Sequence, residues 1–198
     1  MNSDLVFPNK NEDAFLERAE KLGYQALIFA YEKKEHIPQK RLNHEKIKIF
    51  SACLEKVKNA DLIIAEHSDK DRERIERKEI QLLYHLETDE KRDFLHQRAS
   101  GLNHILAELC SEKKVMVSFS HNLLLKSKKR ALLLGRMMQN IGLCRKYKVP
   151  MVFASFASAP IEMRSPHDLK ALGIVLGMHP SEAKESLSSL YEYIATKK

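Results

Sequence analysis

The stretch from Val115 to Ala154 reads VMVSFSHNLLLKSKKRALLLGRMMQNIGLCRKYKVPMVFA, and it predicts a strand, a long helix and a second strand. Its ends, 115–119 and 149–154, are apolar runs of strand length. Between them, residues 128–147 follow a helical period, and the apolar face of that helix consists of Leu133, Met137, Ile141 and Cys144. Because a helical crossover joins strands that run parallel, this stretch predicts an α/β fold.

The same alternation continues along the rest of the chain. Further strands are predicted at 4–7, 26–30, 61–65 and 81–86. Helices are predicted at 11–22, 43–59, 69–79, 100–110 and 166–177, with another one beginning at Pro180. Ser127 is expected to cap the long helix, and Ser165-Pro166-His167-Asp168 has the pattern of a helix start. Six parallel strands fit either a closed barrel or an open sheet, and 198 residues fit one domain over 1–198.

Positive charge is concentrated in one segment of the chain. Residues 113–161 contain ten Lys or Arg and no Asp or Glu, whereas the whole chain has a net charge of +7, which leaves −3 for the remainder. Basic residues gathered on folded elements favour a polyanionic partner.

The two ends of the helix at 128–147 are both basic, but for different physical reasons. Cations are unfavourable beside the positive end of a helix dipole, so their presence at its start favours contact with phosphates; these are Lys126, Lys128, Lys129 and Arg130. At the other end, Arg145, Lys146 and Lys148 suit the dipole, and a structural role explains them equally well. Arg164 precedes a helix start, where free N–H groups and a guanidinium could together bind phosphate.

The cysteines and the hydropathy pattern indicate the compartment. Cys53, Cys110 and Cys144 are far apart in apolar helical patterns, so we expect buried free thiols in a reducing environment. The N-terminus lacks the apolar core of a signal peptide, and no apolar run reaches the roughly 18–20 residues of a membrane helix. These features predict a soluble, cytoplasmic protein that does not bind a membrane.

Three histidines raise the alternative of a metal site. His67, His85 and His121 lie near the ends of predicted strands, with Glu66 and Glu87 close by. Sites in parallel α/β folds are built at that edge, and these groups could hold a metal for phosphodiester hydrolysis. The chain has no Walker loop, Gly-x-Gly-x-x-Gly, Gly-x-Ser-x-Gly or His-Glu-x-x-His motif, which disfavours an ordinary nucleotide-dependent enzyme.

Four segments resemble, in order and spacing, the thirty-kilodalton ribonuclease P protein family, known in archaea as component 3. They are 98–106 (RASGLNHIL), 115–120 (VMVSFS), 143–150 (LCRKYKVP) and 163–177 (MRSPHDLKALGIVLG). The resemblance covers about residues 98–188, and the Arg-Ser-Pro-x-Asp-Leu motif, which begins at Arg164, is its most diagnostic part.

The resemblance implies an irregular TIM-barrel-like fold with six to eight parallel strands and surrounding helices, related to metal phosphoesterases. It implies a non-catalytic subunit of ribonuclease P, in which the RNA removes the 5′ leader of precursor tRNA with its own bound Mg²⁺, and no cofactor bound by the protein. It also implies pairing with a small ferredoxin-like protein subunit. The expected RNA-binding residues are Arg98, Lys126, Lys128, Lys129, Arg130, Arg136, Arg145, Lys146, Lys148 and Arg164.

The sequence departs from related patterns at two places. The metal phosphoesterases carry His-x-His on the first strand, where this chain has Asp4-Leu-Val-Phe7, and this disfavours metal catalysis. The ribonuclease P family commonly has a basic residue where this chain has His121. Two other functions stay open: a metal-dependent phosphoesterase that uses His67, His85 and His121, and an interaction scaffold that docks a partner through its apolar helix faces.

Overall fold

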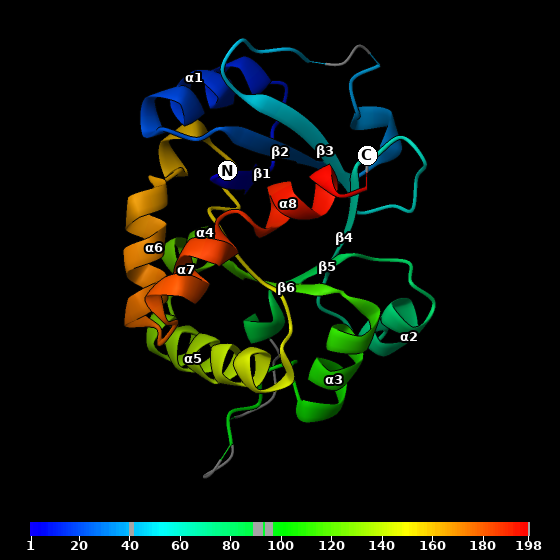
Figure 1. Ribbon diagram of the computed structural model, residues 1–198, viewed down its shortest axis with the longest axis vertical. Coiled ribbons are helices and arrows are strands. Elements are labelled where there is room, and N and C mark those ends of the chain that lie inside the picture. Colours follow the sequence, from blue (N-terminus) through cyan, green and yellow to red (C-terminus); the bar gives the residue numbers. More distant parts are fainter. Residues whose placement is uncertain (40–41, 89–92, 94–96, 198) are drawn as a thin grey trace.

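The structure is a computed structural model, and it describes residues 1–39, 42–88, 93 and 97–197. Within these residues, seven parallel strands follow one another around a barrel in the order of the sequence (Figure 1). The strands are β1 (Ser3–Val6), β2 (Ala26–Tyr31), β3 (Lys48–Cys53), β4 (Leu62–Glu66), β5 (Leu82–Tyr84), β6 (Met116–Ser120) and β7 (Met151–Ala154). The predicted α/β, TIM-barrel-like fold is confirmed.

The barrel interior is an apolar core built from alternate strand positions. Leu5, Ile28 and Ile64 are among its fully buried members, because successive side chains on a strand point to opposite faces of the sheet. Helix α8 (Ser189–Ala195) lies across the opening at the N-terminal edge of the barrel, where the strands begin (Figure 1). Its Leu190 and Ile194 join the same core and close the barrel at that end.

The remaining helices surround the strands on the outside. They are α1 (Glu12–Leu22), α2 (Asp71–Glu76), α3 (His104–Lys113), α4 (His121–Lys126), α5 (Arg130–Tyr147), α6 (Pro166–Val175) and α7 (Pro180–Ser186). Three short 3-10 turns are η1 (Lys34–His36), η2 (Leu86–Thr88) and η3 (Pro160–Glu162). In the part of the chain that the structure describes, no helix combines the length and the apolar character needed to cross a membrane.

Two predicted helix boundaries are confirmed by their caps. Gly23 ends α1 in a left-handed conformation, with φ of 82°, and its N–H donates to the carbonyls of Ala19 and Glu20. Ser165 begins α6: its Oγ accepts from the N–H of Asp168, and the Asp168 carboxylate accepts from the N–H of Ser165.

The predicted helix at 43–59 is wrong, because β3 occupies its centre. Phe50 has the spacing of a helical face in the sequence, yet it points into the barrel together with Ala52, at the spacing of a strand. Parallel pairing with β2 on one side and β4 on the other satisfies the β3 backbone. This pairing outweighs the local helical pattern and raises the strand count from six to seven.

Helix α4 is absent from the sequence-based prediction, and it shifts the start of the long helix. Ser120 caps α4 by accepting from the N–H of Leu123 at 3.1 Å. Ser127 ends α4, and α5 begins at Arg130 and not at 128. The predicted apolar face is confirmed, since Leu133, Met137, Ile141 and Cys144 are all buried. The three cysteines are buried and free, as predicted.

A buried carboxylate joins the first strand to the last. Asp4 of β1 is fully buried, and it accepts from the N–H and the hydroxyl of Ser155, just after β7, both at 2.6 Å. Beside it, the N–H of Phe156 donates to Leu5, and the N–H of Phe7 donates to Ala157. These bonds, with a bridge between Val6 and Ala157, nearly close the barrel between β1 and β7.

The Asp4 site predicts that stability falls as the pH rises toward neutrality. Burial raises the pKa of Asp4 from 3.8 to about 7, against the opposing hydrogen bonds from Ser155. Between these values the unfolded chain releases a proton that the folded chain keeps, so the free energy of unfolding decreases with pH. Burial also raises the pKa of Glu87 to about 7, so Glu87 acts in the same window.

We therefore expect the chain to be less stable toward urea at pH 8 than at pH 5. The double variant D4N/E87Q, which has no titrating group at either position, should show a smaller loss between the two pH values. An equal loss in the wild-type chain and the double variant would contradict this assignment.

Candidate nucleic-acid interface

The structure divides the expected RNA-binding residues between opposite ends of the barrel. Helix α5 has 18 residues, so its two ends lie about 27 Å apart. Lys126, Lys128, Lys129 and Arg130 lie at its start, on the C-terminal edge of the barrel, where the strands end. Lys146 and Lys148 lie at its other end, beside the start of β7. The basic residues therefore form two surfaces.

At the C-terminal edge, two lysines are free to bind an anion. Lys128 and Lys129 are exposed, and their ammonium groups have no ion-pair partner among the residues that the structure describes. Lys126 instead pairs with Glu162 at 3.0 Å. The guanidinium of Arg130 donates to the carbonyls of Leu124 and Leu125, both at 3.0 Å, and so caps the end of α4.

Arg164 lies at the same edge, in the turn before α6. One of its terminal nitrogens, Nη1, donates to the carbonyls of Ile161 and Met163, at 3.1 and 3.0 Å. These bonds hold the Nη1 end of the guanidinium against the turn. Burial lowers the pKa of the nearby His121, and the positive charge of Arg164 lowers it further. His121 stands where the resembled family commonly has a basic residue, and its lowered pKa favours the neutral imidazole.

The N-terminal edge carries three lysines, of which only Lys148 was predicted from the sequence to bind RNA. Lys78, Lys114 and Lys148 each adopt a left-handed backbone, with φ between 52° and 58°, at the corner between a helix and the next strand. The three strands that follow, β5, β6 and β7, are direct neighbours. Glycine is the usual residue at a helix end with a left-handed backbone. A lysine in place of glycine after each of three helices is the sequence pattern that could have identified this surface.

Two other cations at this edge, Arg145 and Lys146, have internal contacts. Arg145 forms a two-point ion pair with Glu182, at 2.8 and 2.6 Å, and also donates to the carbonyl of Gly177. It therefore fastens α5 to α7. Lys146 lies over the ring of Tyr147, with its Nζ 5.3 Å from the centroid.

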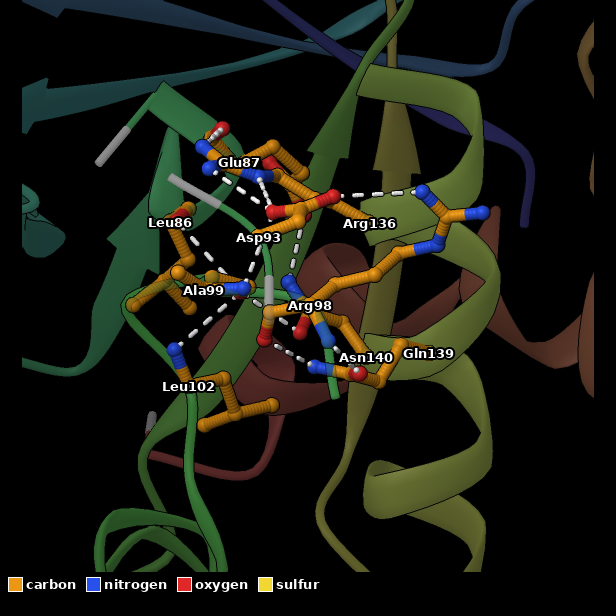
Figure 2. A network of polar contacts seen from close by, with 10 residues as sticks. Leu86, Glu87, Asp93, Arg98, Ala99, Leu102, Arg136, Gln139 and Asn140 are labelled. Atoms are coloured by element: carbon orange, nitrogen blue, oxygen red, sulfur yellow. Dashed lines mark hydrogen bonds and ion pairs between the residues drawn. The ribbon is translucent and has the colours of Figure 1, made fainter. Parts of the chain in front are cut away.

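Arg136 belongs to the interior and corrects its expected role as a surface contact. It is 2% exposed, and its guanidinium donates to the Asp93 carboxylate at 3.0 Å and to the carbonyl of Glu87 at 2.8 Å (Figure 2). Arg136 lies three residues after Leu133 and one before Met137, on the predicted inner face of the helix. That spacing is the signal for its burial.

Arg98 lies on the solvent side of the same network. Its Nη1 pairs with Asp93 at 3.2 Å, and Gln139 bonds to both its backbone N–H and its carbonyl (Figure 2). Gly135 leaves space for this side chain, because a Cβ there would lie 2.3 Å from the Arg98 Cζ. Burial would raise the pKa of Asp93, but the N–H of Ala99 and the two arginines outweigh it and lower the pKa.

A second set of buried polar contacts connects Glu87 and Ser100 to α5. Asn140 donates to the carboxylate of Glu87 at 2.9 Å and accepts from the hydroxyl of Ser100 at 2.7 Å. Together with Arg136 and Gln139, Asn140 attaches the segment after β5 to α5 at several points (Figure 2). This network positions Arg98 beside the helix.

Two of the three candidate histidines contact different carboxylates. His67 Nδ1 lies 2.5 Å from the Asp71 carboxylate, and His85 Nδ1 lies 3.0 Å from Glu66. His121 lies half-buried at the start of α4. In the described ranges, no group of three or more His, Cys, Asp or Glu side chains is placed to hold a metal ion.

Aromatic rings occupy the end of the barrel where a metal site would be expected. Phe7, Tyr84, His85 and Phe156 follow the ends of β1, β5 and β7, with ring centroids 4.8–6.2 Å apart. Tyr84 and Phe156 are almost completely buried. Phe7 continues the first strand, so it stands in the region where the metal phosphoesterase pattern has His-x-His.

Comparison with known families identifies the C-terminal half of the chain. The model of the family described as RNase P subunit p30 matches residues 92–198. Because this match covers more than half of the chain, the chain belongs to that family.

Similar proteins include two archaeal chains named ribonuclease P protein component 3. That of Methanosarcina acetivorans is 37% identical over 102 residues, which cover 50% of this chain and 43% of the relative. That of Thermococcus kodakarensis is 39% identical over 90 residues, which cover 44% of this chain and 41% of the relative. The matched region thus spans less than half the length of these relatives.

Two solved structures share the fold at low sequence identity. A chain in the cryo-EM structure of archaeal ribonuclease P with mature tRNA has a TM-score of 0.76 and 20% identity, over 98% of this chain and 90% of that chain. The histidinol phosphate phosphatase of Lactococcus lactis, crystallised with zinc, L-histidinol and phosphate, has a TM-score of 0.61 and 8% identity, over 90% and 94% of the chains.

The Arg136 network predicts unequal effects of two arginine substitutions. R136M should lower the free energy of unfolding by about 3 kcal/mol, because it removes the buried partner of Asp93 and of the Glu87 carbonyl. R98M removes an exposed partner of the same carboxylate and should cost less than about 1 kcal/mol. Urea titrations of both variants measure the difference, and equal losses would show that Arg136 has no special structural role.

Proposed function

We propose that this member of the RNase P subunit p30 family is an RNA-binding protein subunit of ribonuclease P. In this role it supports the catalytic RNA during removal of the 5′ leader from precursor tRNA. The observation that carries the proposal is the family match over residues 92–198. That half of the chain supplies Lys128, Lys129, Lys114, Lys148 and Arg164 to the two basic surfaces.

The proposed mechanism is neutralisation of RNA phosphates by lysines that have no internal partner. An ammonium group that contacts a phosphate releases condensed counterions, so binding is favourable and depends on salt. A-form RNA hides its base edges in a deep, narrow groove, which favours recognition of shape and backbone. By stabilising the folded RNA, the chain would lower the Mg²⁺ concentration that the RNA needs.

The two basic surfaces support contact with separate parts of the RNA. They lie at opposite ends of α5, about 27 Å apart. Arg136 and Arg145 contribute indirectly, because Arg136 connects Asp93 and Glu87 to α5 and Arg145 fastens α5 to α7.

A protein partner is also part of the proposal. Met138 on α5 is 51% exposed, and Ile174 and Val175 at the end of α6 are exposed as well. These apolar positions support docking of a second protein, and the family resemblance makes a small ferredoxin-like subunit the proposed one. Mg²⁺ is proposed to be bound by the RNA, and a cytoplasmic location stays a prediction.

The contacts of the candidate histidines do not support the alternative of a metal-dependent phosphoesterase. His67 contacts the Asp71 carboxylate, His85 contacts the Glu66 carboxylate, and aromatic rings around Phe156 lie at the same end of the barrel. The proposal therefore keeps the chemistry in the RNA.

Charge reversal at the C-terminal edge tests the first surface. K128E/K129E should weaken binding to ribonuclease P RNA by more than about tenfold and lower the salt dependence of binding by about two phosphate contacts. Both side chains are exposed, so circular dichroism and the unfolding midpoint should be unchanged. The matched control K56E/K58E makes the same change in charge at exposed lysines on another side of the barrel. Equal weakening by both variants would show a nonspecific effect of net charge.

The N-terminal edge predicts a second, independent loss of affinity. K114N/K148N removes two cations, and asparagine tolerates the left-handed backbone of both positions. We expect the slope of log affinity against log salt concentration to fall by the equivalent of about two phosphate contacts. This loss should add to that of K128E/K129E. Filter-binding titrations from 50 to 300 mM salt measure both effects. An unchanged salt dependence in K114N/K148N would restrict the RNA surface to the C-terminal edge.

A further inference from the structure

One side of the barrel lacks the helices that cover strands in a regular βα barrel. Of the described residues between β2 and β3, only Lys34–His36 form a short 3-10 turn, and residues 54–61 between β3 and β4 form no helix. In Figure 1 the described chain on either side of β3 runs as loops, apart from the short turn η1. A sheet face with apolar side chains normally buries them against a second layer of structure.

The uncovered face forms a groove of about 790 Å³. Its lining includes the aliphatic side chains of Ile37, Leu42, Ile49 and Val57, all of which are only partly buried. Ile49 points outward from β3, whereas Phe50 points into the barrel. The chain therefore leaves an aliphatic surface at the position of a missing helix layer.

The groove carries a positive charge. Lys34, Lys56 and Lys58 line it, and Asp61 is its one acidic residue among those that the structure describes. The Asp61 carboxylate accepts from the N–H of Ser51 at 3.0 Å, so it belongs to the wall of the groove. Lys56 and Lys58 are exposed, and no acidic side chain in the described part of the chain pairs with them.

We propose that this groove binds an acidic amphipathic helix of a partner protein. The apolar face of the helix would cover Ile49 and Val57 and supply the missing layer, and its carboxylates would meet Lys56 and Lys58. A β-strand does not fit, because β2 and β3 already have strand partners on both sides.

The lining favours a helix over RNA. Phe29 and Tyr31 in the groove are 1% and 5% exposed, so they offer no ring face on which a base could stack. Aliphatic side chains fit leucine or isoleucine of a helix better. The groove also lies outside residues 92–198, so this proposal does not rest on the proposed function.

Photocross-linking identifies what occupies the groove. The photoreactive amino acid benzoylphenylalanine replaces Val57 in the full chain, and the same replacement at Ile105, which is 52% exposed on α3, is the control. After irradiation in cells that express the chain, mass spectrometry identifies the cross-linked peptide. The expected product, specific to position 57, is a partner segment with net negative charge and apolar residues at helical spacing. An RNA adduct, a second copy of this chain, a segment of other chemistry, or no adduct above that of the control would overturn the proposal.

A binding measurement then tests the charge and the helix. A synthetic peptide of the cross-linked segment should become helical on binding, as seen by circular dichroism, and should bind K56E/K58E at least tenfold more weakly than the wild-type chain. K128E/K129E, with the same charge change elsewhere, should bind the peptide as the wild-type chain does. Equal affinity of the wild-type chain and K56E/K58E would overturn the proposal. Because the proposed RNA surface is assayed with a different variant and a different ligand, failure of one proposal leaves the other intact.

Discussion

The barrel depends on the contact between its first and last strands, and Asp4 provides that contact. Six strand pairs form between neighbours along the sequence, but β1 and the end of β7 are about 150 residues apart and share only a few bonds. The fully buried carboxylate of Asp4 holds two donors of Ser155 and so brings together the half of the chain outside the family match and the half within it. The same contact keeps Phe7 and Phe156 together at the C-terminal edge of the barrel.

The barrel also determines which cations are available to a ligand. Arg136 and Arg145 are used within the protein, because each bonds to a carboxylate and a backbone carbonyl. Lysines without an ion-pair partner among the described residues remain at both ends of α5. The helix thus separates two basic surfaces by a fixed distance, and its Asn140 bonds to Glu87 and Ser100. This arrangement agrees with the proposed contact with RNA at two separate places.

Much of the fold follows from the sequence, because buried parallel strands and capped helices have strong local patterns. The failures have physical causes. Residues 43–59 alternate weakly and fit a helix, and only pairing with two other strands makes 48–53 a strand. Arg136 was predicted to bind RNA because of its charge, although its place on the apolar face of α5 indicated burial. Lys78 lies outside residues 113–161, the segment without Asp or Glu. It joins a basic surface only because the barrel places β5 next to β6 and so Lys78 near Lys114.

The most direct measurement is cleavage of precursor tRNA by ribonuclease P RNA with its other protein subunits, with and without this chain, over a range of Mg²⁺ concentrations. An RNA-supporting subunit predicts that the chain lowers the Mg²⁺ concentration for half-maximal cleavage and cleaves nothing when the RNA is absent. An unchanged Mg²⁺ requirement would contradict the account. So would cleavage by the chain alone that is lost on His85→Ala, since the chemistry would then belong to the protein.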